Sequence, residues 1–115
     1  MDGSGAEARA LDYLRSQGLR LLARNWRCKL GELDLVMQDG DTVAVIEVRS
    51  RTRTDRGSAA ETVDARKQAR LVRATRLWLA RRPDLAEQPL RFDVVTLDAG
   101  ALDWRREAFD AGEQS

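Results

Sequence analysis

Hydrophobic residues that recur every three to four positions predict two helices in this chain. The first helix is expected from Gly5 to about Gln17, with Ser4 as its N-cap. The second is expected from about Thr62 to Arg82, because Pro83 cannot continue it. Its apolar stripe includes Trp78, which we expect in the core. Each helix therefore has one face to bury against another layer.

Shorter hydrophobic runs bounded by polar residues and glycines predict strands between and after the helices. The strands are expected at Leu19–Arg27, Gly31–Gln38, Thr42–Arg49 and Arg91–Leu97, with a further edge strand at 101–109. The order α-β-β-β-α-β is typical of the α/β class, with a mixed central sheet flanked by helices. We expect a single domain over residues 1–115, with a core at about 3–98 and a frayed tail after about 109.

The second and third strands are joined by a short hairpin signal, Asp39-Gly40. If these two residues form the turn, Glu32 lies opposite Glu47. Asp34 and Glu47 are then diagonal neighbours on one face, about 7–8 Å apart at the backbone. The hairpin therefore predicts two carboxylates that converge on one side of the sheet.

Composition narrows the chemistry that such carboxylates can do. The 115 residues include no histidine and one cysteine, Cys28, so histidine-based zinc sites, Ser-His-Asp triads and thiolate clusters are excluded. Oxygen ligands of the remaining kind suit Mg²⁺ or Mn²⁺. The net charge is only +1, so any nucleic-acid contact must come from local clusters of basic residues. Without a long apolar stretch or a signal-peptide pattern, a cytoplasmic protein with no membrane contact is expected.

The end of the third strand carries the strongest chemical signal. The hydrophobic run at 43–46 is followed directly by Glu47-Val48-Arg49. Asp34 and Glu47 can bind one metal ion, with the Val48 carbonyl as a third ligand. A bound metal ion polarises a phosphoryl oxygen and activates water, and a neighbouring cation stabilises the developing negative charge. The pattern favours phosphodiester chemistry.

Several short motifs together resemble the uncharacterised bacterial YraN family. They are Gly3-x-Gly5-Ala6-Glu7, Ala23-Arg24-Asn25-Trp26-Arg27, Gly31-Glu32-Leu33-Asp34-Leu35, Glu47-Val48-Arg49-x-Arg51, Lys67 and Arg91-Phe92-Asp93-Val94-Val95. That family looks like the restriction-endonuclease-like, PD-(D/E)xK nuclease group and is similar to archaeal Holliday-junction resolvases. The resemblance covers about residues 3–98 and implies a restriction-endonuclease-like fold.

The resemblance also implies roles for individual residues. Asp34 and Glu47 match the metal ligands of the nuclease group, and Glu7 matches a glutamate of the first helix that completes such sites. Arg49 stands where the group usually has lysine, and arginine does not readily deprotonate. Lys67 matches a family position on the inward stripe of the second helix, and we hypothesise that it supplies the missing ammonium.

Structural alternatives stay open for several of these residues. Glu7 follows Ser4 by three positions and can form a capping box, and Lys67 can lay its stem along the core edge. Arg91 and Asp93 are expected to pair within the fold. The densest basic run either contacts phosphates or forms a solvated loop; it consists of Arg49, Arg51, Arg53 and Arg56.

Three functions are compatible with these patterns. The first is a Mg²⁺- or Mn²⁺-dependent nuclease that acts on DNA, including branched or otherwise structured DNA. The second is a nucleic-acid-binding module that keeps the nuclease fold without catalysis. The third is a small adaptor that holds a protein partner on its sheet. A homodimer is expected only if DNA junctions, which have two strands to cut, are the substrate.

Overall fold

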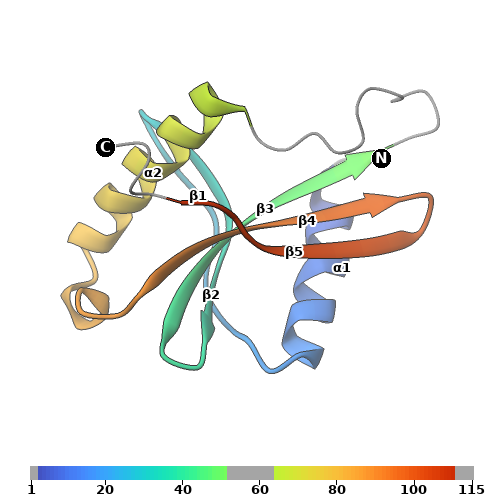
Figure 1. Ribbon diagram of the computed structural model, residues 1–115, viewed down its shortest axis with the longest axis horizontal. Helices are drawn as coiled ribbons and strands as arrows, with labels where there is room; N and C mark the ends of the chain where they lie inside the picture. The colour runs from blue at the N-terminus through green and yellow to red at the C-terminus, as the bar shows by residue number, and fades with distance from the viewer. Residues whose placement is uncertain (1–2, 52–63, 111–115) are drawn as a thin grey trace.

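The structure is a computed structural model that describes residues 3–51 and 64–110 (Figure 1). Its elements are α1 (Gly3–Ser16), β1 (Arg20–Cys28), β2 (Gly31–Asp39), β3 (Thr42–Arg51), α2 (Ala65–Ala80), a short 3₁₀ helix η1 (Pro83–Leu85), β4 (Leu90–Asp98) and β5 (Ala101–Phe109). The strands form one sheet in the order β1-β2-β3-β4-β5. Only β3 and β4 pair in parallel, so the sheet is mixed. The predicted α/β class, element order and edge strand at 101–109 are confirmed.

The parallel pairing of β3 and β4 follows from the helix between them. A parallel connection must return the chain to the same end of the sheet, and α2 belongs to that return. Figure 1 shows α1 and α2 on opposite sides of the sheet. The core is accordingly divided into two clusters, one under each helix. Leu14 of α1 is buried in the cluster under α1. Trp78 of α2 is buried in the cluster under α2, as predicted.

The turn between β2 and β3 differs by one residue from the prediction. Asp39 pairs with Thr42, so the turn residues are Gly40 and Asp41, and the predicted turn Asp39-Gly40 is wrong. Gly40 has a φ of 63°, which glycine adopts without a steric penalty. The change shifts the strand register by two residues and keeps the same side chains on each face.

A local irregularity in β1 lies beside the predicted site. Asn25 has a left-handed φ of 53°, a conformation that asparagine tolerates better than most residues. It lies between the pairs Arg24–Leu35 and Trp26–Leu33, and is therefore opposite Asp34. Asp34 thus faces an irregular position of β1, which is separate from the register shift between Leu21 and Ala23.

The helix boundaries also differ from the predicted ones. α1 begins at Gly3, so Ser4 lies inside its first turn and is not the predicted N-cap. The N-cap of α2 is Asp64, whose carboxylate accepts a hydrogen bond from the Lys67 N–H at 2.9 Å. The helix ends at Ala80, two residues before the predicted end. The predicted start at Thr62 lies outside the described residues.

The predicted pairing of Arg91 with Asp93 is confirmed. Asp93 is fully buried and accepts hydrogen bonds from Arg91, from the Trp104 indole and from the Glu107 backbone N–H at 2.9–3.0 Å. Arg91 also binds Asp39 at 2.8 Å. A buried carboxylate with this many donors is fully satisfied, so the cluster connects β2, β4 and β5 as a structural unit.

Candidate functional site

A pocket of about 230 Å³ lies where β2, β3 and the first half of α2 meet. It is lined by Gly31, Glu32, Asp34, Glu47, Lys67, Arg70 and Leu71. Five of these seven residues carry a charged side chain, and both signs are present. The pocket is therefore suited to a polar or charged ligand and unsuited to an apolar one.

Asp34 is held in the pocket by the backbone of the neighbouring strand. Regular pairing of β2 and β3 ends at Leu35–Ile46, and the same register continued by one pair places Asp34 directly across from Glu47. The prediction that Asp34 and Glu47 are diagonal neighbours is thus corrected, and the prediction that they share one face of the sheet is confirmed. The Val48 N–H donates to Asp34 Oδ2 at 2.9 Å, a bond that fixes the carboxylate.

The electrostatic environment of Asp34 favours its protonated form. The pKa of Asp34 is raised from 3.8 to about 7, chiefly by burial and next by the negative charge of Glu47, while the Val48 N–H opposes the rise. The charge of Glu7 raises this pKa further. Strongly perturbed carboxylates in a pocket are typical of functional sites.

Glu47 forms a close ion pair with another residue of the pocket lining. Its side chain is 8% exposed, and its Oε2 lies 2.6 Å from Nζ of Lys67, which is 40% exposed. Lys67 is in the first turn of α2, which the Asp64 cap holds in place. The structure thus places the Lys67 ammonium at the pocket, and its role in the chemistry stays a prediction.

Glu7 approaches the site from α1, outside the lining of the pocket. Its Oε1 is buried and has no hydrogen-bond partner in residues 3–51 and 64–110. Because α1 begins before Ser4, the predicted capping box does not account for this side chain. Glu7, Asp34 and Glu47 bring three carboxylates into one region, where Lys67 is the paired cation. A buried acceptor without a donor indicates that this region can accommodate another cation.

Asp34 and Glu47 fit a magnesium ion that is bound jointly by the protein and by its substrate. In the described part of the chain no three His, Cys, Asp or Glu side chains converge as a complete metal cluster. Mg²⁺ does not require one, since it is commonly held by one or two carboxylates together with waters and substrate phosphates. Asp34 and Glu47 supply that number of carboxylates. The Val48 carbonyl stays a predicted ligand, since the contact found for Val48 is made by its N–H.

The remaining predicted residues are placed less centrally. Arg49 is half-buried on β3, two residues after Glu47, and does not line the pocket. Arg51 ends β3, and its side chain is outside the description, as are Arg53 and Arg56 entirely. The phosphate-contact role of these four arginines stays a prediction.

Glu32 has a different neighbour from the one predicted. The expected opposition to Glu47 is wrong, because the register is shifted by two residues. Glu32 pairs with Arg27 on β1, and the two side chains form an exposed ion pair at 3.4 Å. The acidic residue directly across the hairpin from Glu47 is therefore Asp34, in place of the predicted Glu32.

Sequence reasoning missed two residues that shape the site. Arg70 lines the pocket one turn after Lys67, a position that the helical i, i+3 spacing could have indicated. Asn25 lies opposite Asp34 and interrupts β1 there. Asparagine between two residues of a predicted strand is a weak signal of such a left-handed position.

Known proteins with similar sequences fall in a family that is described as uncharacterised. The model of "Uncharacterised protein family UPF0102" matches residues 6–97. A UPF0102 protein of Pseudomonas entomophila is 54% identical over 113 residues, which cover 94% of this chain and 92% of that protein. One from Stutzerimonas stutzeri is 51% identical over 113 residues, covering 95% and 94%. No helix in the described residues has the length and apolar character needed to cross a membrane. These matches confirm the family resemblance found in the sequence, and the chain belongs to the uncharacterised UPF0102 family.

Proposed function

We propose that this protein is a Mg²⁺-dependent nuclease that hydrolyses phosphodiester bonds in DNA. The observation that supports it most is Glu47, a buried carboxylate at the end of a hydrophobic strand, across from Asp34 and 2.6 Å from the Lys67 ammonium. Burying a carboxylate in this way is costly unless cations compensate it. The arrangement provides paired anionic ligands and a cation within one pocket, as metal-assisted phosphoryl chemistry requires.

Each residue then has a distinct role. Asp34 and Glu47 would hold the metal ion, with the Val48 carbonyl as a further ligand, and Glu7 would add negative charge from α1. Mg²⁺ or Mn²⁺, when bound, would supply Lewis-acid chemistry and an activated water. Lys67 and Arg49 would hold the scissile phosphate and stabilise the charge that develops on it. The Val48 N–H keeps Asp34 oriented toward the pocket.

The raised pKa of Asp34 is compatible with this role. Metal ions bind the deprotonated carboxylate, so metal binding at this site releases a proton and becomes stronger as pH rises. With its pKa at about 7, Asp34 is partly protonated at neutral pH when no metal is present. We therefore expect cleavage to increase from pH 6 to pH 8.

Branched DNA is the specific substrate that the resemblance to junction resolvases favours. Because a junction has two strands to cut, this substrate would require a homodimer. Since the relatives from Pseudomonas entomophila and Stutzerimonas stutzeri are bacterial proteins, we propose that the protein acts in the cytoplasm, where it meets chromosomal DNA.

A second function, nucleic-acid binding without catalysis, is favoured by two observations. Arg49 occupies the position where the nuclease group usually has lysine. Lys67 already compensates Glu47 at 2.6 Å, so a metal ion must share or displace that contact. A protein with this pocket can keep its affinity for phosphates after losing turnover.

Cleavage of labelled DNA separates the two functions. Wild-type protein is incubated with duplex, single-stranded and four-way-junction DNA in Mg²⁺, in Mn²⁺ and in EDTA. The nuclease proposal predicts products only with metal and their loss in Glu47→Gln, while Asp12→Asn, an exposed change on α1, stays active. Metal-independent products, or equal products from Glu47→Gln, would contradict it. Binding without products would support the non-catalytic module.

A further inference from the structure

The helix α2 carries a local excess of positive charge. Residues 65–80 contain four arginines and one lysine and no acidic residue. The whole chain has a net charge of +1, so the rest of the chain carries a net charge of −4. A single helix thus holds a local excess of five positive charges on a protein that is otherwise acidic. An attractive field for an anionic polymer is therefore present at this helix.

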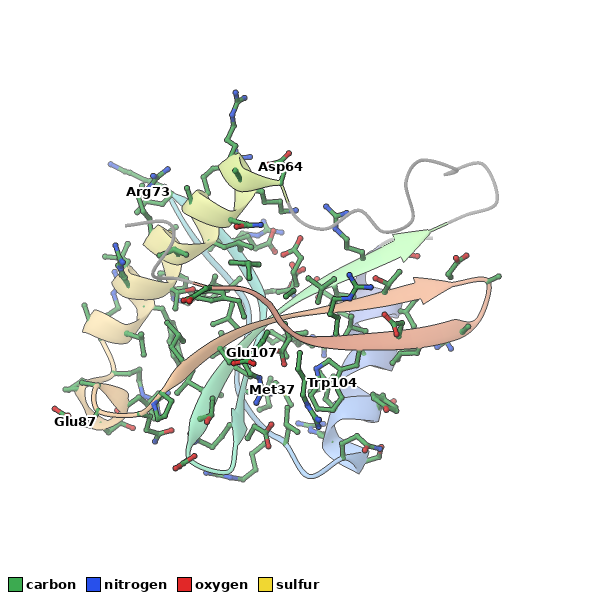
Figure 2. All side chains as sticks on the ribbon, in the orientation of Figure 1. Met37, Asp64, Arg73, Glu87, Trp104 and Glu107 are labelled. Atoms are coloured by element: carbon green, nitrogen blue, oxygen red, sulfur yellow. The ribbon has the colours of Figure 1, made fainter. Side chains whose placement is uncertain are left out.

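Three of these arginines form a continuous row, which we call the arginine stripe: Arg66, Arg70 and Arg73. Their spacing of i, i+4 and i+7 places them on one face of α2. All three are exposed, and Figure 2 labels Arg73 beside α2 and Asp64 at the start of this helix. Among the described residues none of the three forms an ion pair, so their charge is available to a ligand.

The arginine stripe is continuous with the candidate site. Arg70 lines the pocket next to Lys67, and Arg66 and Arg73 lie one turn to either side of it. At Gly31, where β2 begins, an added Cβ would lie 3.9 Å from Cβ of Arg70, so α2 and this strand are packed closely at the pocket wall. A polymer bound along the stripe would therefore pass beside the pocket that Asp34 and Glu47 line.

We propose that the arginine stripe binds the phosphate backbone of DNA and guides it into the pocket. The identity of the ligand as DNA rests on the proposed function. Guanidinium groups bind phosphate oxygens in a bidentate manner, and a row of them makes contacts that do not depend on base sequence. This surface is distinct from the basic run at residues 49–56 that sequence reasoning selected.

An anionic membrane fits this surface less well than DNA does. A membrane-binding amphipathic helix needs a free apolar face to insert between lipids. The apolar face of α2, which includes Leu71, Val72 and Trp78, is buried against the sheet. Leu77 is the exposed large hydrophobic residue of this helix, and one such side chain does not form an insertion surface.

The test compares two triple variants that lose the same charge. One is Arg66→Gln/Arg70→Gln/Arg73→Gln. The other replaces three exposed arginines of α1 and β1 and serves as the control: Arg15→Gln/Arg20→Gln/Arg24→Gln. Glutamine is a good helix former, so α2 is expected to stay folded, as circular dichroism would check. Binding to a fluorescent DNA duplex is measured in EDTA at several salt concentrations, which separates binding from cleavage.

Each phosphate contact contributes about 0.9 to the slope of log K against log salt. The stripe variant is expected to lose about 2.7 from this slope and about 100-fold in affinity at 0.15 M salt. The control is expected to stay within about threefold of wild type, since its arginines lie outside the path. Equal losses in both variants, an unchanged stripe variant, or no DNA binding by wild type would overturn the proposal. So would binding of phosphatidylserine vesicles without binding of DNA.

These outcomes are independent of the nuclease proposal. Stripe-dependent DNA binding without metal-dependent cleavage would support the arginine stripe and reject catalysis. Cleavage that needs Glu47 but proceeds equally in the stripe variant would support catalysis and reject the stripe.

Discussion

Replacement of Asp34 by asparagine should stabilise the metal-free protein at high pH. Asparagine keeps an oxygen that can accept the Val48 N–H, and it removes the negative charge that burial and Glu47 disfavour. Because the pKa of Asp34 is raised in the folded state, that state holds its proton where the unfolded chain has lost it. The free energy of unfolding should therefore fall as pH rises from about 4 to about 7.

The size of this effect follows from the pKa. If the whole shift is counted, the rise in the pKa of Asp34 from 3.8 to about 7 corresponds to about 4 kcal/mol in the free energy of unfolding. Asp34 is only partly buried, so solvent screening reduces the value, and we expect about 2 kcal/mol. Asp34→Asn should match wild type near pH 4 and exceed it by about 2 kcal/mol near pH 8.

Urea denaturation of both proteins in EDTA, from pH 4 to pH 8, measures this difference. Asp12→Asn, an exposed change on α1, is the control and should follow wild type at every pH. The reasoning would be refuted if Asp34→Asn were less stable than wild type at pH 8. A constant difference across the pH range would refute it as well, since it would show that the charge of Asp34 carries no penalty.

Substitutions at three further positions test other parts of the structure, each by urea denaturation in EDTA. Lys67→Met should lose about 1–2 kcal/mol because it leaves Glu47 buried without its ammonium, and a loss confined to a few tenths would show that this ion pair is unimportant. Asp93→Asn should lose about 3–4 kcal/mol because Arg91 keeps its charge in a part-buried site, and a loss under about 1 kcal/mol would contradict the structural role of this cluster. Asn25→Val should lose about 1–2 kcal/mol and Asn25→Gly much less, because valine resists the left-handed φ; equal losses would exclude backbone strain as the cause.

The sequence was sufficient for the element order because the hydrophobic periods differ clearly between helices and strands. The strand at 101–109 and the buried position of Trp78 follow from the same patterns. The shared face of Asp34 and Glu47 was also predictable. Moving a two-residue turn along the chain by one position shifts the strand register by two residues, which leaves the same side chains on each face. Which two residues form that turn was not predictable, because Asp39-Gly40 and Gly40-Asp41 both contain the glycine that the turn needs.

Features that depend on contacts between distant segments were beyond the sequence patterns. The Asp34–Val48 hydrogen bond arises where β2 and β3 stop pairing, and no local spacing specifies that point. The ion pair between Lys67 and Glu47 depends on how α2 packs on the sheet. The basic surface was predicted at residues 49–56 because arginines are dense there in sequence. On α2 the arginines are spread over two turns and become a row only in the folded helix.

Whether Asp34 and Glu47 bind one divalent cation together is tested most directly by a crystal soaked in Mn²⁺, with diffraction recorded near the manganese absorption edge. We predict an anomalous peak in the pocket, about 2.1 Å from an oxygen of each carboxylate, and its absence in Glu47→Gln. A pocket without a peak, in which Lys67 stays on Glu47 and Asp34 on the Val48 N–H, would contradict the metal site and the nuclease proposed from it.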